Sequence, residues 1–399
     1  MENRLGLLAL VLMTSLAANG CGGSSQSSTI RSTTFSASAS ATTTTARPNT
    51  TTSSSAASAG GPVPAGTKAT SVTFISPTTA FVLGTAPCRR APCSVILRTR
   101  DRGRSWQGLP APLESVSEFE GNGLWGLRFG DAHHGYAFGQ GLWQTSNGGA
   151  SWQHGPAPAR TVLALEAVQD SELVAVAAPC LPGQSRCADG LTLYHRPISS
   201  GNWTAVAGVR TYSFQASIAV HGVVVWVLAG TSLYVSTNGG ASFASHSQPC
   251  KPRSSYATPT AVTDDGPRTY VVCSGEGAVG SVAKYVYRAT GTESSWTPTG
   301  RAPFPGNPGD ISAGSDSAIV LSAASGASWL YRGTDGGQRW KTVLTEDDGG
   351  VGWGDLGFTT STDGVIIHGP AIPYGTNNDR PGELLLTDDG GQTWQRVHF

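Results

Sequence analysis

The chain has 399 residues, and its 26 basic and 26 acidic side chains cancel to a formal net charge of zero. No dense block of lysine and arginine occurs, so nucleic-acid binding is not expected. The 52 glycines and 24 prolines, together with many short apolar runs, favour an all-β protein with numerous turns.

Residues 1–21 have the pattern of a targeting segment. Arg4 and the amino terminus are positive, and the apolar run Leu5–Leu16 is shorter than the ~20 residues that span a bilayer. The following Ala17-Ala18-Asn19-Gly20-Cys21 resembles a bacterial lipobox in which Cys21 is lipidated, although Ala18 stands where leucine is commoner. We expect a lipoprotein anchored outside the cytoplasm on the bacterial cell membrane. An ordinary secretory signal with an incidental cysteine is the alternative.

Residues 22–66 consist largely of Ser, Thr, Ala and Gly, with no aromatic residue after Phe35. Such a composition buries too little apolar surface to offset the entropy of ordering. We predict a disordered tether with a reach on the order of 40 Å, which its threonines would allow to be O-glycosylated. The remainder, 67–399, is long for a single-core domain at roughly 330 residues, and a repeat fold would explain that length.

An eight-residue phrase recurs, with drift, five times in this domain. The copies begin at Thr99, Thr145, Ser236, Gly333 and Thr387 and follow S/T-x-D/N-x-G-x-S/T-W/F. The third residue can bond backbone N–H groups of a tight turn, and the glycine at the fifth position supplies φ > 0. Apolar runs precede four copies, which predicts strand, turn, strand. The structural residues of the turns are Asp101, Asn147, Asn238, Asp335 and Asp389, with the closing aromatics Trp106, Trp152, Phe243, Trp340 and Trp394.

This phrase resembles the Asp-box, or BNR repeat, of sialidase-like β-propellers. The resemblance covers Thr67 to Phe399 and implies that each copy is a turn between the third and fourth strands on the bottom face of a blade. The stretch Phe129–Gly139 and the phrase after it look much like the repeat unit of photosystem II assembly-factor-like propellers exported by bacteria. In that group the propeller is usually a non-catalytic platform, an argument by analogy.

The spacing of the closing aromatics sets the number of blades. Successive copies lie 46, 91, 97 and 54 residues apart, so each of the two double gaps should hold a degenerate copy. The candidates end at Trp203 and Trp296, where a strand and a polar turn persist without the Asp. Seven repeats predict a seven-bladed β-propeller of four-stranded antiparallel blades, which we expect to be monomeric.

The cysteines agree with export. Six remain when Cys21 is set aside, and an even number in an oxidising compartment predicts disulfides. Of the fifteen possible connectivities we predict Cys88–Cys93, Cys180–Cys187 and Cys250–Cys273. Zinc binding is the alternative, but there is neither a CxxC pair nor a histidine at ligand spacing to support it. No metal or cofactor is expected.

If the phrase lies on the bottom face, the top face carries the loops between second and third strands and the connections between blades. Binding residues concentrate on such loops. The predicted top-face segments are Cys88–Cys93, Cys180–Cys187, Ser274–Ser281 and His368–Gly382, and the connections Leu109–Asn122, Ser247–Pro259, Arg301–Gly309 and Val343–Gly354.

Two aspartates are candidates for catalysis. Aligning the inner strands on their apolar residues places Asp310 level with Asp355, and two such carboxylates could flank a glycosidic bond as acid and base or acid and nucleophile. Trp353 and Tyr374 could stack on a sugar ring. Asp347, Asp348 and Arg253 complete the predicted ligand-binding set. The alternative, which we favour, is that these residues are solvated turn residues and polar channel lining.

A sialidase would require an Arg-Ile-Pro phrase near the first blade, where this chain has Val72–Pro77 without arginine. Sialidase activity is therefore not expected. The favoured function is a non-catalytic binding or scaffold module for a protein or glycan of the cell envelope, engaged through the top face, with contact to the membrane through the lipid anchor only. The alternative is a propeller-type glycoside hydrolase that uses the paired carboxylates.

Overall fold

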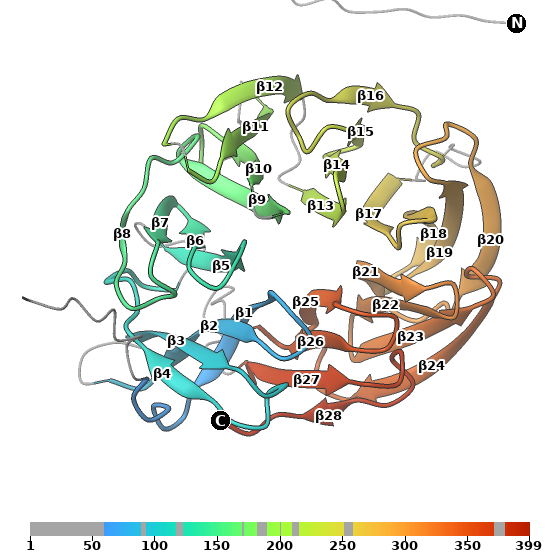
Figure 1. The fold of residues 1–399 in the computed structure, drawn as a ribbon. Helices are drawn as coiled ribbons and strands as arrows, with labels where there is room; N and C mark the ends of the chain where they lie inside the picture. The colour runs from blue at the N-terminus through green and yellow to red at the C-terminus, as the bar shows by residue number, and fades with distance from the viewer. Residues whose placement is uncertain are drawn as a thin grey trace, which may run out of the picture. The chain divides into compact units, whose positions relative to one another are not determined.

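The computed structural model describes residues 60–88, 93–116, 123–169, 171–181, 190–199, 201–209, 215–250, 258–370 and 380–399. These residues form seven antiparallel sheets of four strands each, with no helix among them. The sheets stand as blades around a central opening (Figure 1). The seven-bladed, all-β propeller predicted from the repeats is confirmed.

Each blade consists of four strands that are consecutive in the chain and neighbours in the sheet. The first blade holds β1 (Lys68–Phe74), β2 (Ala80–Ala86), β3 (Cys93–Thr99) and β4 (Gln107–Leu109). The second holds β5 (Leu124–Phe129), β6 (Gly135–Gly139), β7 (Gly141–Thr145) and β8 (Gln153–His154). The third holds β9 (Thr161–Val168), β10 (Glu172–Ala178), β11 (Leu191–Pro197) and β12 (Thr204–Val209). The fourth holds β13 (Ala216–His221), β14 (Val224–Ala229), β15 (Ser232–Ser236) and β16 (Ala244–His246).

The remaining three blades follow the same order. The fifth holds β17 (Thr258–Asp264), β18 (Arg268–Ala278), β19 (Ser281–Thr290) and β20 (Thr297–Ala302). The sixth holds β21 (Asn307–Ser315), β22 (Ala318–Ala324), β23 (Ser328–Thr334) and β24 (Arg339–Glu346). The seventh holds β25 (Trp353–Phe358), β26 (Gly364–His368), β27 (Glu383–Thr387) and β28 (Gln395–Arg396). The segment Ser274–Ser281, predicted as a loop, instead extends β18 and β19 into a long hairpin, because these residues continue to pair across the two strands.

The repeated turn is held by the side chains of its first and third residues. In the last copy Thr387 Oγ1 donates to Asp389 Oδ1 (2.8 Å), the N–H of Gly391 donates to Thr387 Oγ1 (3.0 Å), and the N–H of Thr393 donates to Asp389 Oδ1 (3.0 Å). The copies that begin at Thr99, Thr145 and Ser236 make the same three bonds. In all five copies the fifth-position glycine has a φ between 77° and 90°, a region that favours glycine.

Asp335 departs from this arrangement. Its own φ is 55°, and its carboxylate pairs with Arg339 (Oδ2–Nη2 2.5 Å), while the turn is closed by the carbonyl of Thr334. The reason lies in the sequence, since Gly333 at the first position has no hydroxyl and Arg339 replaces the hydroxyl at the seventh. The structural role predicted for Asp335 therefore does not match that of the other four residues.

Three of the closing tryptophans join their blade to the one before it, whereas Trp106 and Trp340 donate within their own turns, to the carbonyls of Gly103 and Gly337. The indole N–H of Trp152 donates to the carbonyl of Pro110 (3.0 Å), that of Trp203 to Pro156 (2.7 Å), and that of Trp296 to Ser247 (2.7 Å). Trp203 and Trp296 belong to the two degenerate copies, which have lost the aspartate of the turn but retain this contact between blades. The third and fifth blades predicted from them are present.

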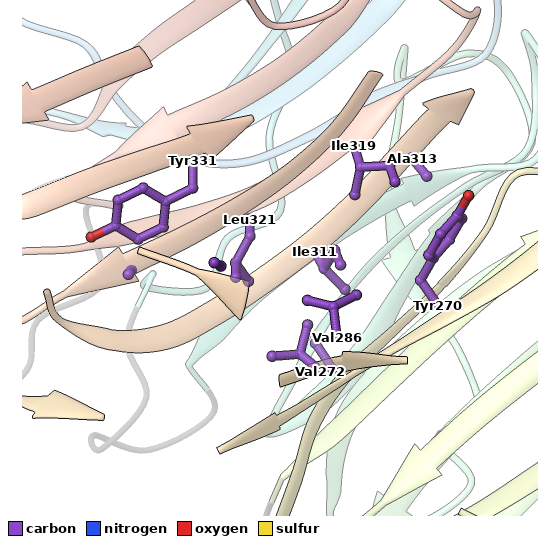
Figure 2. Packing of buried hydrophobic residues seen from close by; sticks show 11 residues of the cluster. Tyr270, Val272, Val286, Ile311, Ala313, Ile319, Leu321 and Tyr331 are labelled. Atoms are coloured by element: carbon purple, nitrogen blue, oxygen red, sulfur yellow. The ribbon is translucent and has the colours of Figure 1, made fainter. Parts of the chain in front are cut away.

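The core lies between the faces of neighbouring blades. Between the fifth and sixth blades, side chains of both sheets interdigitate, as Figure 2 shows. This cluster includes Tyr270, Val272, Val286, Ile311, Ala313, Ile319, Leu321 and Tyr331. Full burial of a Val, Leu or Ile side chain contributes about 1.5–3 kcal/mol, so each seam between blades supplies part of the stability of the ring.

Two of the predicted disulfides are present. Cys88 bonds to Cys93 and Cys250 to Cys273. Cys180 is also disulfide-bonded, and Cys187, its predicted partner, lies outside the described residues. Other predicted residues outside them are Cys21, Arg253 and Tyr374.

The ring closes without exchange of a strand, because all four strands of the seventh blade come from the C-terminal part of the chain. The N–H of Ala69 on β1 donates to the carbonyl of Gly382, just before β27 (2.7 Å). Gly61 pairs with Gly108 on the outer strand β4, so contacts with the ring begin before Thr67. Closure therefore depends on contacts between the first and last blades, which include a buried apolar cluster and polar contacts at the central channel.

Candidate functional site in the central channel

A cavity of about 430 Å³ lies at the centre of the ring, and the inner strands of all seven blades line it. These are the first strands of each blade, which run from the top face, where the connections between blades lie, towards the bottom face. Both candidate catalytic residues, Asp310 and Asp355, line this cavity. Both aspartates were expected to line one channel, and the structure brings them together there.

Six of the seven inner strands carry a β-bulge towards their start, at which the register with the second strand shifts. Only the pairing of β13 is regular throughout. A bulge inserts a residue and re-aims its side chain. The bulge residues that line the cavity are Thr70, Trp125, Leu163, Asp310, Asp355 and Leu356. The bulges thus form a tier around the upper part of the channel.

The bulges also correct the predicted alignment of the two aspartates. Asp355 follows Gly354, the last regularly paired residue of β25, and is the first residue of its bulge. Asp310 follows Pro308 by two positions and is the second residue of its bulge. The two carboxylates are therefore one position out of register, because apolar periodicity does not reveal an inserted residue. Asp355 also has a φ of 51°, a left-handed conformation that costs an L-residue roughly 1–2 kcal/mol.

Both carboxylate oxygens of Asp355 are occupied. Oδ2 accepts hydrogen bonds from Ser71 Oγ (2.5 Å) and from the N–H of Val72 (2.7 Å) on β1. Oδ1 accepts one from Arg128 Nη2 on β5 (3.1 Å). A single side chain of the seventh blade therefore binds both the first and the second blade, at the seam where the ring closes.

Arg128 extends this network to the third blade. Its Nε donates to Glu166 Oε1 on β9 (2.5 Å). Burial alone would lower the pKa of Arg128, but the charges of Asp355 and Glu166 outweigh it and raise that pKa. Burial raises the pKa of Glu166, against the opposing effect of Arg128. One guanidinium thus compensates two carboxylates, and neither of them is free to bind a ligand without losing a partner.

Asp264, on β17, is the third bonded carboxylate of the cavity. It accepts hydrogen bonds from Trp226 Nε1 (3.0 Å), from the N–H of Gly266 (2.6 Å) and from Thr269 Oγ1 (3.3 Å). Burial raises its pKa. Its acceptors are directed at neighbouring strands and turns of the fourth and fifth blades, so its role is structural.

Asp310 differs from these three. Among the described residues its carboxylate forms no ion pair, and its hydrogen-bond donor is the backbone N–H of Leu356. The side chain is open to the water of the channel. Enclosure by the inner strands and the like charge of Asp355 raise the pKa of Asp310 to about 6. It is therefore the carboxylate of the cavity that is available to a ligand.

Glu166, Asp264 and Arg128 are channel residues that the sequence patterns did not predict. The available signal was a single charged residue within an otherwise apolar inner strand, as in Leu127-Arg128-Phe129 and Ala164-Leu165-Glu166-Ala167. Residues of an inner strand that point away from the neighbouring blades must face the channel, so such charges mark its lining. Which charges meet across the ring depends on the bulges.

Of the predicted ligand-binding residues, the three that lie within the described part of the chain, Asp347, Asp348 and Trp353, are not among those that line the channel cavity. Asp348 accepts from His368 Nε2 (2.6 Å), and the ring of Trp353 lies 4.8 Å from that of His368. His368 is buried and also contacts Glu383 Oε2 through Nδ1 (3.2 Å). Burial would raise the pKa of Asp348, but its bonds to His368 and Ser328 hold it low. Asp348 and Trp353 thus belong to a buried cluster of the seventh blade, and Asp347 is exposed nearby.

Within the described parts of the chain, no group of three or more His, Cys, Asp or Glu side chains is arranged to hold a metal ion. Nor does this part of the chain contain an apolar helix of the length needed to cross a bilayer.

No family model matches the chain, and no curated protein matches it. Solved structures do resemble it. A structure of YCF48 bound to D1 peptide is 14% identical with a TM-score of 0.49, over 84% of this chain and 96% of that one. YCF48 from Cyanidioschyzon merolae is 14% identical with a TM-score of 0.37, over 85% and 87%. The GH74 enzyme of Niastella koreensis is 12% identical with a TM-score of 0.33, over 82% and 65%. At these identities the likeness concerns the fold.

Proposed function

We propose that this protein is an exported, lipid-anchored propeller of the Asp-box type that binds a protein or glycan of the cell envelope through its top face and catalyses no reaction. The lipobox-like sequence before Cys21 and the tether after it support the location. The observation that best supports a non-catalytic role concerns Asp355. Both of its carboxylate oxygens accept hydrogen bonds from neighbouring blades.

A glycosidase with two carboxylates needs one protonated acid and one free carboxylate that acts as nucleophile or base. A carboxylate that accepts a backbone N–H, a hydroxyl and a guanidinium is held in its ionised form by these partners, and it would have to give them up to attack a sugar or activate a water. Glu166 is bound by the same guanidinium. Asp310 then has no second carboxylate to work with, which favours binding over hydrolysis.

Two exposed apolar residues on the top face of the fifth blade support the proposal that the protein binds a macromolecule. The hairpin of β18 and β19 carries the exposed Val279 at its tip, and Phe304 is exposed on the following connection. The ammonium of buried Lys284 donates to the carbonyls of Pro303, Phe304 and Pro305 (3.1, 2.8 and 2.8 Å), which fixes the loop that carries Phe304. An exposed aromatic on a preorganised loop loses little entropy on binding.

Hydrolysis of a glycoside remains the alternative, on one observation. The pKa of Asp310, raised to about 6, is in the range that suits a general acid near neutral pH.

The test is a hydrolysis assay of the full chain against a panel of aryl glycosides that includes a sialoside. We expect no turnover. Asp310→Asn and, as the matched control, Asp347→Asn, which removes an exposed charge outside the channel, are assayed beside the wild type. Turnover that Asp310→Asn abolishes and Asp347→Asn retains, with both variants folded, would replace the proposed function by the alternative.

A further inference from the structure

We propose that the central channel binds an organic cation, an amine or guanidinium on an apolar stem such as a lysine or arginine side chain of a binding partner, with Asp310 as its counter-ion. The inference rests on the proposed function, because it assigns the channel a role in binding and none in catalysis.

The net negative charge of the cavity favours a positively charged ligand. Its lining holds the carboxylates of Asp310, Asp355, Glu166 and Asp264 against the single guanidinium of Arg128. Arg128 is already shared by Asp355 and Glu166, so the excess of negative charge remains uncompensated around Asp310. A narrow channel with low-dielectric walls concentrates such a field and attracts cations.

The walls of the cavity indicate a ligand with an apolar part. Trp125, Leu163, Ile218, Val220 and Leu356 line it and are only partly buried, so they present apolar surface to channel water. Polar groups make up more than half of the exposed wall, so the cavity suits a ligand that combines an apolar stem with a charged end, and 430 Å³ lies within the usual size of sites for organic ligands. A bare metal ion would not use this surface, and the described residues provide no ligand cluster for one.

The position of Asp310 fits entry from the top face. Asp310 and Trp125 both belong to the tier of bulges near the starts of the inner strands, and those strands begin at the top. A side chain that descends from a partner on the top face would reach this tier first. Its charged end would meet Asp310 while its stem contacts the apolar bulge residues Trp125 and Leu163.

The experiment is isothermal titration of the full chain with n-butylammonium, with Nα-acetyl-lysine methylamide, and with 1-butanol as the neutral analogue. Both cations should bind, 1-butanol should bind at least about tenfold more weakly, and methylammonium should lose up to about fourfold in affinity for each methylene that it lacks. Asp310→Asn should weaken both cations at least about tenfold, and Asp388→Asn, which removes an exposed charge from the last repeated turn outside the channel, should leave them unchanged.

A wild-type readout avoids dependence on the folding of the variant. Affinity for the cations should fall as the pH is lowered through about 6, where Asp310 takes up its proton, while that of 1-butanol stays constant. Absence of measurable cation binding, equal affinity in Asp310→Asn, or equal affinity for 1-butanol would each overturn the inference. Because turnover is measured separately, loss of this inference leaves the proposed non-catalytic function in place.

Discussion

Asp355 and Arg128 form an ion pair (Oδ1–Nη2 3.1 Å) although 227 residues separate them in the chain. They belong to the seventh and second blades, and the first blade, bound by the same carboxylate through Ser71 and Val72, lies between them. Because no strand is exchanged between the first and last blades, contacts of this kind hold the ring together where its ends meet. The strained backbone of Asp355 is consistent with a conformation imposed by this role.

Asp355→Ala should therefore weaken the ring at its seam. The change leaves Val72 N–H and Ser71 Oγ without their acceptor and Arg128 with one carboxylate, and each loss of this kind costs about 1–3 kcal/mol. We expect the free energy of unfolding to fall by about 2–3 kcal/mol, measured by urea denaturation. Asp347→Ala, the exposed control, should change it by less than about 0.5 kcal/mol. Equal effects of the two substitutions would contradict this account.

The two types of repeated turn provide a second prediction. Asp389 accepts hydrogen bonds from Thr387, Gln392 and Thr393, whereas the Asp335 carboxylate is engaged, among the described residues, in an exposed ion pair with Arg339. Asp389→Ala should cost about 1–2 kcal/mol, and Asp335→Ala, at the same place in its phrase, less than about 0.5 kcal/mol. Denaturant midpoints of the two variants test this. A cost at Asp335 equal to that at Asp389 would contradict the distinction.

These turns also show what the sequence could predict. The repeated phrase fixed the number of blades, because each position in it has a local reason that needs no distant partner. It even located the degenerate copies, since Trp203 and Trp296 keep their contact with the preceding blade. The different turn at Asp335 is not predictable from the phrase, because the pattern allows Gly333 at the first position, where the missing hydroxyl changes the hydrogen bonds of the turn.

The candidate site was predictable only in part. That Asp310 and Asp355 face one channel follows from the inner-strand pattern. Their different roles do not, because they depend on which donors the ring brings within reach across three blades. The bulges that shift Asp355 relative to Asp310 leave no mark in apolar periodicity. Likewise Asp348 looked like a free loop acid, and its partner His368 comes from another strand.

The third prediction concerns the buried side chain of Lys284. It is fully buried, and its ammonium, which has three N–H donors, lies within hydrogen-bond distance of four backbone carbonyls, those of Val282, Pro303, Phe304 and Pro305. Lys284→Met keeps the stem and removes the donors, so buried carbonyls lose their partner. We expect a loss of about 2–4 kcal/mol in the free energy of unfolding. Hydrogen exchange at the amide of Val282, which donates to Gly306, should accelerate.

The control for this change is Lys341→Met, since Lys341 is exposed. It should alter neither the free energy of unfolding nor the exchange at Val282. If Lys284→Met behaves like the control, the connection that carries Phe304 does not depend on the ammonium, and its preorganisation needs another explanation.

The proposed anchor is tested at Cys21. The full chain, expressed in a bacterium and fed a labelled fatty acid, should carry the label and sediment with membranes. Cys21→Ser should lose the label and appear in the soluble extracytoplasmic fraction, because a thiol is required for thioether attachment of the lipid. Cys88→Ser, which also removes one cysteine, should keep the label. Labelling that survives Cys21→Ser would place the attachment elsewhere.

Asp310 should change the pH dependence of stability in the direction opposite to that of most carboxylates. Its pKa is raised to about 6, above the value of about 3.9 for an unfolded aspartate. Below about pH 4 Asp310 is protonated in both the folded and the unfolded chain, so it does not lower the free energy of unfolding. Between about pH 4 and 6 the unfolded chain loses its proton first, so stability falls with rising pH, and above about 6 the full cost remains.

Asp310→Asn removes this cost. The variant should therefore be more stable than the wild type at pH 8, by about 1 kcal/mol, less than the shift would give in a closed interior because channel water screens the charge. At pH 4 the difference should be close to zero. Urea denaturation of both proteins at the two pH values measures it, and titrating groups that do not interact with Asp310 cancel in the comparison. A variant less stable than the wild type at pH 8 would mean that the Asp310 carboxylate is needed by the fold, and its availability to a cation would fail with it.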